Sequence, residues 1–289
     1  MLPGMRAKPR IAIVGPGNLG TALALSLAEA GFVVDAVIGR SRKSLREARQ
    51  LAKRAAVLPT TDLGTTQSDL IWICVPDSQI ASAARTFATK LAWTGRTVFH
   101  SSGALTSDEL DPLRRLGASV ASVHPLMTFV RGTRPSLAGV PFAIEGDPAA
   151  ARVARLIVRD LGGSSFTILK KYKPAYHAWG TFASPLFTAL LATAEELAAS
   201  VGVRRKAARQ RMIPILQQTL ANYAAFGAPR AFSGPIIRGD VETVRRHLSV
   251  LAKLPAAMHV YSALAMAALQ YLPTKSKSTI RKTLRPSGR

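Results

Sequence analysis

The chain has 289 residues, of which 48% are hydrophobic, so it can bury one large core or two ordinary ones. A single cysteine excludes a disulfide-rich secreted scaffold, and no apolar leader precedes the first strand pattern, so we expect a cytoplasmic protein. The net charge of +23 favours anionic ligands and permits nonspecific attraction to nucleic acid at low salt. No zinc spacing or helix-turn-helix pattern accompanies this charge, which argues against specific nucleic-acid recognition.

The first predicted strand, at 11–14, runs into a turn with the spacing G-x-G-x-x-G, and a helix pattern follows to residue 30. In that arrangement the first glycine makes the turn, the second lets a pyrophosphate approach the backbone, and the third lets the helix pack close to the strand. Free N–H groups at the helix start then face the phosphates. The alternative is an ordinary glycine-rich turn. The predicted dinucleotide contacts are Gly15, Gly17, Asn18, Leu19 and Gly20.

A second strand is predicted at 32–38, and the charged turn GRSRKS follows it. In dinucleotide-binding folds an acidic residue near the end of this strand holds the ribose 2′-hydroxyl of NAD, whereas an arginine accommodates the 2′-phosphate of NADP. Asp35 has three apolar residues of the strand after it, so it comes too early to reach the ribose. Arg40 and Ser41 stand at the exit of the strand and predict NADP as the cofactor. A solvated arginine in a turn is the plainer alternative.

Further strands alternate with helices along the next part of the chain. Strand patterns lie at 56–58, 69–75, 96–99, 119–123, 142–145 and 166–169, and helix patterns at 44–55, 79–91, 107–116 and 148–161. This alternation predicts a doubly wound parallel sheet, in which ligands bind beyond the carboxyl ends of the strands. The turns VPD and HSSG, which follow two of these strands, should therefore line the same crevice as the glycine-rich turn. We predict cofactor contacts from Val75, Pro76 and Ser101, and a hydrogen bond to the substrate or cofactor carboxamide from Ser102.

From Lys173 onward nearly every pattern is helical, with breaks at Gly202, at 227–235 and at Gly239. The predicted architecture is therefore α/β followed by all-α. It comprises a Rossmann domain over 1–170, a helical domain over 171–273 and a disordered basic tail over 274–289.

Two stretches in the helical region, 178–194 and 254–274, carry no charged side chain. Both contain proline together with hydroxyl, His or Gln residues, which suit buried helices of a packed domain better than lipid-facing spans. We expect no membrane span.

The start of the helical region, KPAYHAWGTFAS, places Lys173, His177 and Ser184 on one face of a predicted helix. A reductase that takes hydride from a nicotinamide needs a proton donor, and His or Lys can serve when its pKa lies near neutrality. The alternative is a buried histidine beside a solvated lysine. His124, directly after a strand, either faces the crevice or stabilises a turn with the next residue, a proline. No two histidines have metal-ligand spacing with a carboxylate, so no metal is expected.

A second polar segment, SGPIIRGD, spans 233–240. Asp240 is expected to cap a helix over 241–251. Arg238 can clamp a substrate carboxylate in a bidentate way, or it is one more solvated arginine in a basic protein.

These motifs together resemble the Rossmann-like oxidoreductases with a helical C-terminal domain like that of 6-phosphogluconate dehydrogenase. That group includes β-hydroxyacid dehydrogenases, pyrroline-5-carboxylate reductases and ketopantoate reductases. More narrowly, the chain resembles a bacterial branch of oxidoreductases whose C-terminal domain has no defined function. The resemblance spans nearly the whole chain except the tail, and it rests on GPGNLG (15–20), VPD (75–77), HSSGAL (100–105), HPLMTF (124–129), KPAYHAWGTFAS (173–184) and SGPIIRGD (233–240).

The resemblance implies NADP-linked oxidoreduction and a homodimer formed through the helical domain, with a loop such as 233–240 closing the partner's site. In β-hydroxyacid dehydrogenases a Lys and an Asn four residues later meet the substrate. Lys173 matches that Lys, but His177 stands at the Asn position, so a strict hydroxyacid dehydrogenase is not implied. The narrower branch keeps a His there and usually has an Asn where this chain has Pro185. The turn at 39–41 is similar to the Asn-Arg-Thr turn of NADP-using relatives.

We therefore predict an NADPH-dependent reductase of a small anionic carbonyl compound, such as a ketopantoate-like 2-oxo acid, or of an imine. The expected catalytic residues are His177, Lys173 and Ser102, and the expected substrate contacts are His124, Ser184 and Arg238. Two alternatives stay open: a catalytically degenerate protein that binds NADP(H) without turnover, and a basic protein associated with nucleic acid.

Overall fold

The computed structural model describes residues 8–40, 46, 55–133 and 135–284. The chain divides into two compact units, Met1–Thr181 and Phe182–Arg289, and each is described by itself. The division falls inside helix α6 (Lys173–Ala183), later than the predicted boundary after residue 170. The predicted helix at 44–55 lies outside the described residues, apart from its positions 46 and 55.

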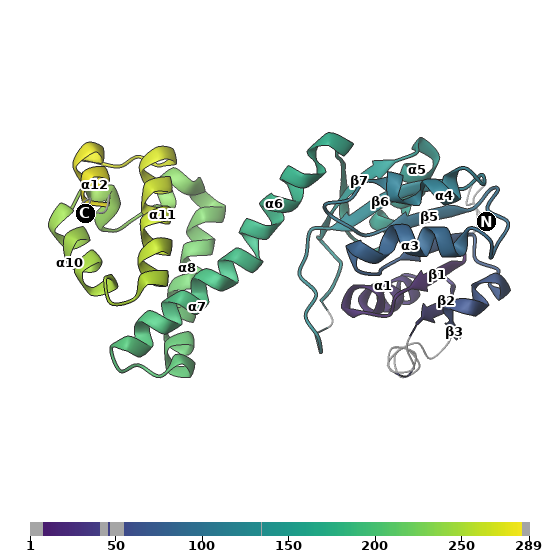
Figure 1. Cartoon of the computed structure of the whole chain (residues 1–289), viewed down its shortest axis with the longest axis horizontal. Helices are drawn as coiled ribbons and strands as arrows, with labels where there is room; N and C mark the ends of the chain where they lie inside the picture. Colours follow the sequence, from purple (N-terminus) through teal and green to yellow (C-terminus); the bar gives the residue numbers. More distant parts are fainter. Residues whose placement is uncertain (1–7, 41–45, 47–54, 134, 285–289) are drawn as a thin grey trace. The chain divides into compact units, whose positions relative to one another are not determined.

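The first unit is built from strands that alternate with helices, as the sequence predicts (Figure 1). The strands are β1 (Ile11–Val14), β2 (Val34–Gly39), β3 (Ala56–Pro59), β4 (Leu70–Ile73), β5 (Thr97–His100), β6 (Ser119–Pro125), β7 (Pro141–Gly146) and β8 (Ser164–Thr167). The α-helices are α1 (Asn18–Glu29), α3 (Asp77–Phe87), α4 (Asp111–Arg114), α5 (Pro148–Asp160) and α6. Short 3₁₀ turns occur at η1 (Thr60–Thr65), η2 (Ser107–Leu110) and η3 (Lys170–Tyr172).

Among the described residues, eight strands form one sheet in the order β3-β2-β1-β4-β5-β6-β7-β8. All neighbours from β3 to β6 are parallel, β6 and β7 are antiparallel, and β8 is parallel to β7. The prediction of a doubly wound sheet is confirmed, with one antiparallel step added at β7. The strand order reverses between β1 and β4, and sheets of this type bind ligands beyond the carboxyl ends of the strands at such a point.

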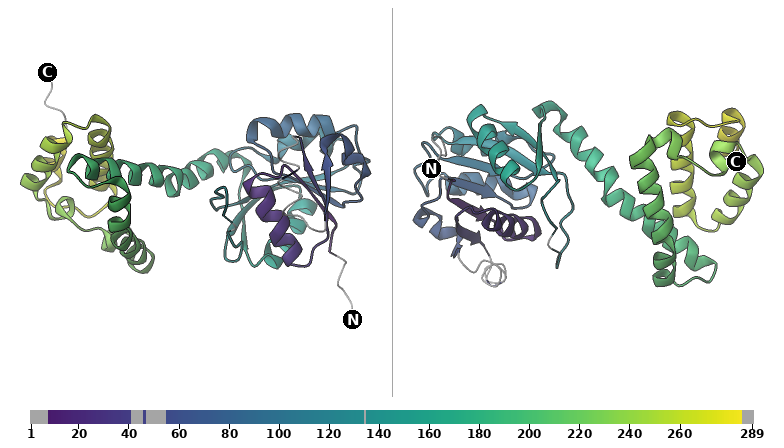
Figure 2. Two further views of the ribbon diagram at one scale, coloured as in Figure 1. Left: turned by 90° about the horizontal axis from the view of Figure 1, so that it is seen from below. Right: turned by 180° about the vertical axis from the view of Figure 1, so that it is seen from behind.

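Successive residues of the central strands face opposite sides of the sheet, so the strands contribute to two separate cores. Ile11 and Ile13 of β1 pack on one face with apolar residues of α1 and α5. Ala12 and Val14 pack on the other face with apolar residues of α3 and α4. Figure 2 shows α1 and α3 on opposite faces of the sheet. Burial on both faces explains why the central strands are continuously hydrophobic in sequence.

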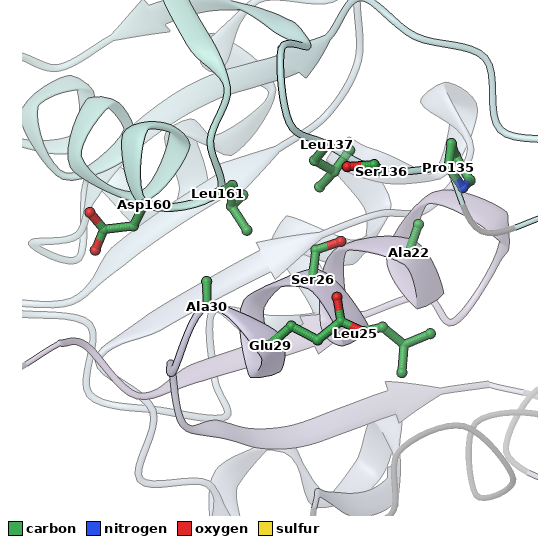
Figure 3. A pocket seen from close by; sticks show the side chains of 10 residues that line it. All are labelled: Ala22, Leu25, Ser26, Glu29, Ala30, Pro135, Ser136, Leu137, Asp160 and Leu161. Atoms are coloured by element: carbon green, nitrogen blue, oxygen red, sulfur yellow. The ribbon is translucent and has the colours of Figure 1, made fainter.

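A cavity of about 390 Å³ opens between the second half of α1, the segment 135–137 and the end of α5 (Figure 3). Its wall mixes apolar side chains with two carboxylates, those of Glu29 and Asp160. Asp160 forms an ion pair with Lys8 (3.0 Å), so this carboxylate already has a partner. None of the predicted site residues lines this cavity.

The second unit contains helices of very different lengths. They are α7 (Pro185–Ser200), α8 (Arg205–Ala231), α9 (Pro235–Arg238), α10 (Val241–Leu251), α11 (Pro255–Tyr271) and α12 (Lys277–Leu284). The predicted breaks are confirmed: Gly202 separates α7 from α8, Gly227 adopts φ +71° and kinks α8, and Gly239 ends α9 in the left-handed region. Asp240 caps α10 as predicted, because its side chain accepts a hydrogen bond from the Thr243 N–H (3.1 Å).

The prediction of a disordered tail over 274–289 is wrong for the part of it that the structure describes. Helix α12 buries Ile280 and Leu284, which lie four residues apart and pack with Val244 and Leu269 of α10 and α11. The lysines and arginines of α12 occupy its other face. The helix is therefore amphipathic, although its sequence is dominated by charged and polar residues. Residues 285–289 lie outside the described part.

None of the helices in the described ranges combines the length and hydropathy that crossing a bilayer requires.

Candidate functional site

The glycine-rich turn joins β1 to α1 and packs against the end of β4. Gly15 adopts φ +94°, and a Cβ on it would lie 2.6 Å from the carbonyl oxygen of Cys74. Gly20 lies in the first turn of α1, where a Cβ would overlap the carbonyl oxygen of Gly15. The packing of the protein itself therefore requires both glycines.

Gly17 differs from these two, because a Cβ on it would meet nothing within 4 Å. It precedes α1 with φ −77° and ψ −168°, an extended conformation open to any residue. No described side chain caps the start of α1, so its first N–H groups are available to a ligand. Packing gives no reason for glycine here, whereas a phosphate that approaches the backbone does. Beside it, Asn18 donates to the carbonyl oxygen of Phe129 (3.0 Å) and Leu19 packs onto the core.

Asp35 and Arg40 lie near opposite ends of the second strand. Asp35, near the start of β2, accepts hydrogen bonds from Arg10 and Ser68. Burial opposes the ionisation of Asp35, but these bonds lower its pKa below the usual value. The carboxylate is therefore already engaged in hydrogen bonds at the amino end of β2. Arg40 follows β2 at the carboxyl end with its side chain exposed. Ser41 lies outside the described residues.

The turns after β4 and β5 lie side by side, as predicted, and a side-chain hydrogen bond joins them. Ser102 Oγ donates to Asp77 Oδ2 (2.8 Å) and accepts from the backbone N–H groups of Ala104 (3.2 Å) and Leu105 (2.9 Å). The proton and the lone pairs of the Ser102 hydroxyl are therefore all engaged in hydrogen bonds within the protein. A direct bond from Ser102 to a substrate would have to replace one of these interactions.

The other predicted residues of these turns have mixed orientations. Ser101 Oγ accepts a hydrogen bond from Trp72 Nε1 (2.7 Å), so its side chain turns into the core. Val75 Cγ1 lies 3.1 Å from the position that a Cβ of Gly15 would take, which places Val75 beside the glycine-rich turn. Pro76 directly precedes α3 and is exposed.

His100 ends β5, and its imidazole is fully buried. Its Nδ1 accepts from the Ser102 N–H (3.1 Å), so the ring proton resides on Nε2, which donates to the carbonyl oxygen of Thr106 (2.9 Å). Burial lowers the pKa of His100 to about 4, so the ring is neutral at pH 7. Both nitrogens hold the loop in shape, and neither is free for a ligand.

Lys173 begins α6 and has no exposed surface, although the side chain carries an amine. Its Nζ donates to the carbonyl oxygen of Ser102 (2.9 Å) and to Ser122 Oγ. Burial lowers the pKa of Lys173 to about 8, against the opposing attraction of Glu145 and Asp77. The amine therefore ties α6 to the loop after β5 and to β6, and it places a positive charge behind that loop.

His124 and His177 come from different elements and meet at Gly103. A Cβ on Gly103 would lie 2.9 Å from His124 Nε2 and 2.7 Å from His177 Cδ2, so a side chain there would collide with both rings. The two imidazoles cross at 81° with centroids 6.3 Å apart. His124 Nδ1 lies 2.7 Å from the hydroxyl of Tyr176. His177 is exposed and His124 is half-buried, so the pair presents a polar edge beside the loop.

Two predicted substrate residues belong to the second unit. The expectation that Ser184 continues the face of Lys173 and His177 is wrong, because α6 ends at Ala183 and Ser184 has non-helical φ −131° and ψ −76°. Pro185 is the cause, since proline lacks an N–H and disfavours helical geometry in the residue before it. Arg238 ends the short helix α9 directly before the left-handed Gly239. The substrate roles of both residues stay predictions.

Sequence reasoning missed two residues of this site. Asp77 lies inside the VPD motif, but nothing in the sequence shows that its carboxylate accepts a hydrogen bond from Ser102 in the turn after β5. Tyr176 lies in KPAYHAWGTFAS, and its contact with His124 joins positions 52 residues apart. Within the described ranges, no three or more His, Cys, Asp or Glu side chains are placed to hold a metal ion.

Comparison with known families gives two matches along the chain. Residues 4–125 match the description of a Rossmann-like domain, and residues 140–268 match a domain of unknown function, DUF2520. The chain thus combines a match to the Rossmann-like domain with a match to DUF2520, and each covers less than half of it. No curated protein matches the sequence.

Several solved structures share the fold of this chain at low sequence identity. A candidate NADP oxidoreductase from Bacteroides fragilis is 23% identical with a TM-score of 0.76, over 90% of this chain and 97% of that one. An imine reductase from Pseudomonas sp. is 19% identical with a TM-score of 0.64, over 96% and 100%. A pyrroline carboxylate reductase from Plasmodium falciparum, solved with NADP bound, is 15% identical with a TM-score of 0.61, over 97% and 98%. At these identities the likeness concerns the fold.

Proposed function

We propose that this protein is an NADPH-dependent reductase of small anionic carbonyl compounds or imines. The observation that carries the proposal is the unfilled space at Gly17, at the uncapped start of α1 and next to the point where the strand order reverses. A dinucleotide pyrophosphate suits such a turn, because N–H groups and the helix dipole both attract phosphate. The imine reductase and the NADP-bound pyrroline carboxylate reductase that share the fold support the same reaction class.

The cofactor site in this proposal is built almost wholly from the first unit's turns. The residues assigned to it are Gly15, Gly17, Asn18, Leu19, Gly20, Arg40, Ser41, Val75, Pro76 and Ser101, of which Ser101 can offer only its backbone because its hydroxyl is bonded to Trp72. The backbone of the glycine-rich turn binds the pyrophosphate, and Arg40 with Ser41 binds the 2′-phosphate. When bound, NADPH supplies a hydride.

His177 is the proton donor in this proposal, because its imidazole is exposed at Gly103 whereas the amine of Lys173 is buried and hydrogen-bonded. Lys173 assists by fixing the loop and by placing positive charge where negative charge develops on a carbonyl oxygen. Ser102 acts through the same loop, which it closes onto Asp77. His124 contacts the substrate at the edge that it shares with His177.

The substrate class follows from charge. A net charge of +23 attracts anions, and an arginine such as Arg238 can hold a carboxylate in a bidentate way, with Ser184 as a further polar contact. We therefore favour ketopantoate-like 2-oxo acids. Cyclic imines that carry a carboxylate share this charge and are the second class to assay.

Titration with NADPH and NADH side by side, at a salt concentration that screens nonspecific phosphate attraction, tests the proposal first. Arg40→Ala should weaken NADPH binding roughly tenfold to a hundredfold, because a hydrogen bond to a charged group contributes about 1.5–3 kcal/mol. The affinity for NADH should stay the same. Arg85→Ala, which removes an exposed arginine of α3, is the charge-matched control. Equal losses for the two cofactors would contradict the role of Arg40, and binding of neither by the unaltered protein would overturn the whole proposal.

A binding protein without turnover is the second candidate. The hydrogen bonds that occupy Ser102 and Lys173 favour it, since they leave few polar groups of the loop free for chemistry. Steady oxidation of NADPH in the presence of a 2-oxo acid or an imine would exclude this candidate.

We also propose that the protein is a homodimer joined through α7 and α8. No residue of α7 is buried, and of the 27 residues of α8 only Ala208 is. Ile215 is 67% exposed and Tyr223 60%, and both are large apolar or aromatic side chains on one long helix. Sedimentation velocity should therefore show a dimer that Ile215→Glu weakens at least roughly tenfold, because a charge would be buried in an apolar interface. A monomer at micromolar concentration would contradict the proposal.

A further inference from the structure

Two buried side chains of opposite charge lie close to each other in the first unit. Among the described residues, Lys173 and Glu145 are the only Lys, Arg, Asp or Glu side chains that are buried. Lys173 has no exposed surface, and Glu145 is 5% exposed. A buried charge without a counter-charge is costly because it has lost its hydration, so buried charges are found paired with opposite ones.

Ser122 of β6 links the two charges. In the antiparallel pairing of β6 with β7 it is the register partner of Glu145, so both side chains leave the same face of the sheet. Ser122 Oγ accepts a hydrogen bond from Lys173 Nζ and donates one to the carbonyl oxygen of Ser102 (3.0 Å). The amine of Lys173 therefore contacts the residue that stands beside Glu145 in the sheet.

Glu145 is held in place by the segment that follows the loop after β5. Its Oε2 accepts from the Ser107 N–H (2.9 Å), and its Oε1 accepts from the Ser107 hydroxyl (2.5 Å). Both oxygens accept, which is how an ionised carboxylate bonds. The other cation beside it is Lys170, with Nζ 3.9 Å from Oε1, but Lys170 is exposed and is bonded to Asp108. Lys173 is thus the buried cation near this fixed carboxylate.

Four titratable groups face Lys173 from the elements packed around it. His100 of β5 and His124 of β6 are neutral at pH 7, because burial lowers the pKa of each to about 4. Burial also lowers the pKa of Lys173 to about 8, and the attraction of Glu145 and then of Asp77 opposes this lowering. Asp77 is exposed, so water screens its charge more than that of Glu145.

We propose that Glu145 is a positioning residue, the buried counter-charge that keeps Lys173 an ammonium group against the carbonyl oxygen of Ser102. The pairing follows from burial and strand register, whereas its role in reduction rests on the proposed function. In that function the pair keeps a positive charge fixed behind the loop after β5, where it stabilises negative charge that develops on the substrate.

The ¹³Cε resonance of Lys173 reports the charge of its amine without any turnover. In the full-length protein labelled with ¹³C-lysine, and assigned by comparison with Lys173→Met, this signal should titrate with a midpoint at about pH 8. Glu145→Gln keeps the size of the side chain and removes its charge. It should weaken proton binding by Lys173 roughly tenfold or more and move the midpoint to about pH 7 or below.

The matched control is Glu109→Gln, which removes the charge of a half-buried glutamate of η2 and should leave the midpoint unchanged. An unchanged midpoint in Glu145→Gln, or an equal change in Glu109→Gln, would overturn the proposal.

Urea unfolding tests the pairing in a second way. Glu145→Gln and Lys173→Met each leave one buried charge without its counter-charge, so each should lower the urea midpoint. The double variant contains neither charge and should be more stable than Glu145→Gln alone. If Glu145→Gln fails to fold, recovery of folding in the double variant supports the pair. A double variant no more stable than Glu145→Gln would overturn it.

A pH profile of kcat then separates the pair from the proposed function. A role for the Lys173 charge predicts that kcat falls as pH rises through about 8, because the amine then loses its proton. This alkaline limb should move to lower pH in Glu145→Gln, whereas a general loss of structure would lower kcat at every pH. A limb that stays in place would overturn the role in reduction. A shifted ¹³Cε titration in a protein that reduces no 2-oxo acid or imine would instead count against the proposed function.

Discussion

Replacement of His177 by alanine should lower kcat about 10²- to 10⁴-fold, which is the range for removal of a general acid. The expectation follows from position, because His177 is the exposed imidazole at Gly103 while Lys173 is buried. The Kd of NADPH should not change, since the proposed cofactor contacts lie on the turns after β1, β2, β4 and β5. Stopped-flow or steady-state oxidation of NADPH measures the first quantity, and fluorescence titration measures the second.

The matched control for this variant is His259→Ala, which removes an exposed histidine of α11 to which we assign no role. Normal turnover in His177→Ala would exclude His177 as the proton donor and would direct attention to His124. A parallel loss of cofactor affinity would show instead that the ring helps to build the binding site.

Alanine at Gly17 and at Gly20 should produce opposite results, although the two glycines belong to one motif. Gly20→Ala places a methyl group into the carbonyl oxygen of Gly15, which is backbone and cannot rotate away. Overpacking of this kind destabilises a protein by about 1–3 kcal/mol or more. Gly17→Ala meets no atom within 4 Å, and alanine tolerates its extended backbone, so the free energy of unfolding should stay equal or rise by about 0.4–1 kcal/mol.

Gly17→Ala, which should keep the stability of the protein, should nevertheless weaken NADPH binding. A methyl group in the space that we assign to the pyrophosphate should weaken binding roughly tenfold to a hundredfold, because it displaces charge-assisted hydrogen bonds of about 1.5–3 kcal/mol. Urea unfolding and NADPH titration of the same two variants give all four numbers. Unchanged affinity in Gly17→Ala would mean that no phosphate approaches this turn, and the proposed function would lose its main support.

The parts of the fold that could be predicted are those with local signals. The central strands β1 and β4 could be predicted because each is a continuous apolar run. The turn between β1 and α1 could be predicted from its glycine spacing. Asp35 could also be excluded from the cofactor site in advance, because its place within a strand fixes the end at which it lies. In each of these cases the determining residues are close neighbours in the chain.

The parts that could not be predicted depend on contacts between distant segments. Ser102 is polar and lies in the expected loop, but its engagement with Asp77 follows only from the pairing of β4 with β5. The burial of Lys173 depends likewise on Ser122 of β6. The error at Ser184 was avoidable, since Pro185 directly after it is a local sign of a helix break.

The C-terminal helix has a consequence for the polar segment at 233–240. Ile236 packs onto the same core as Ile280, and the N–H of Lys275 donates to the carbonyl oxygen of Ile237 (3.0 Å). Gly239 also lies against Lys275 and Ser276, with no room for a side chain between them. A protease that cut the chain before Lys275 would therefore do more than shorten it, because it would remove the contacts that support α9, the helix that ends at Arg238. If Arg238 has the substrate role proposed above, substrate binding and resistance to digestion would be lost together.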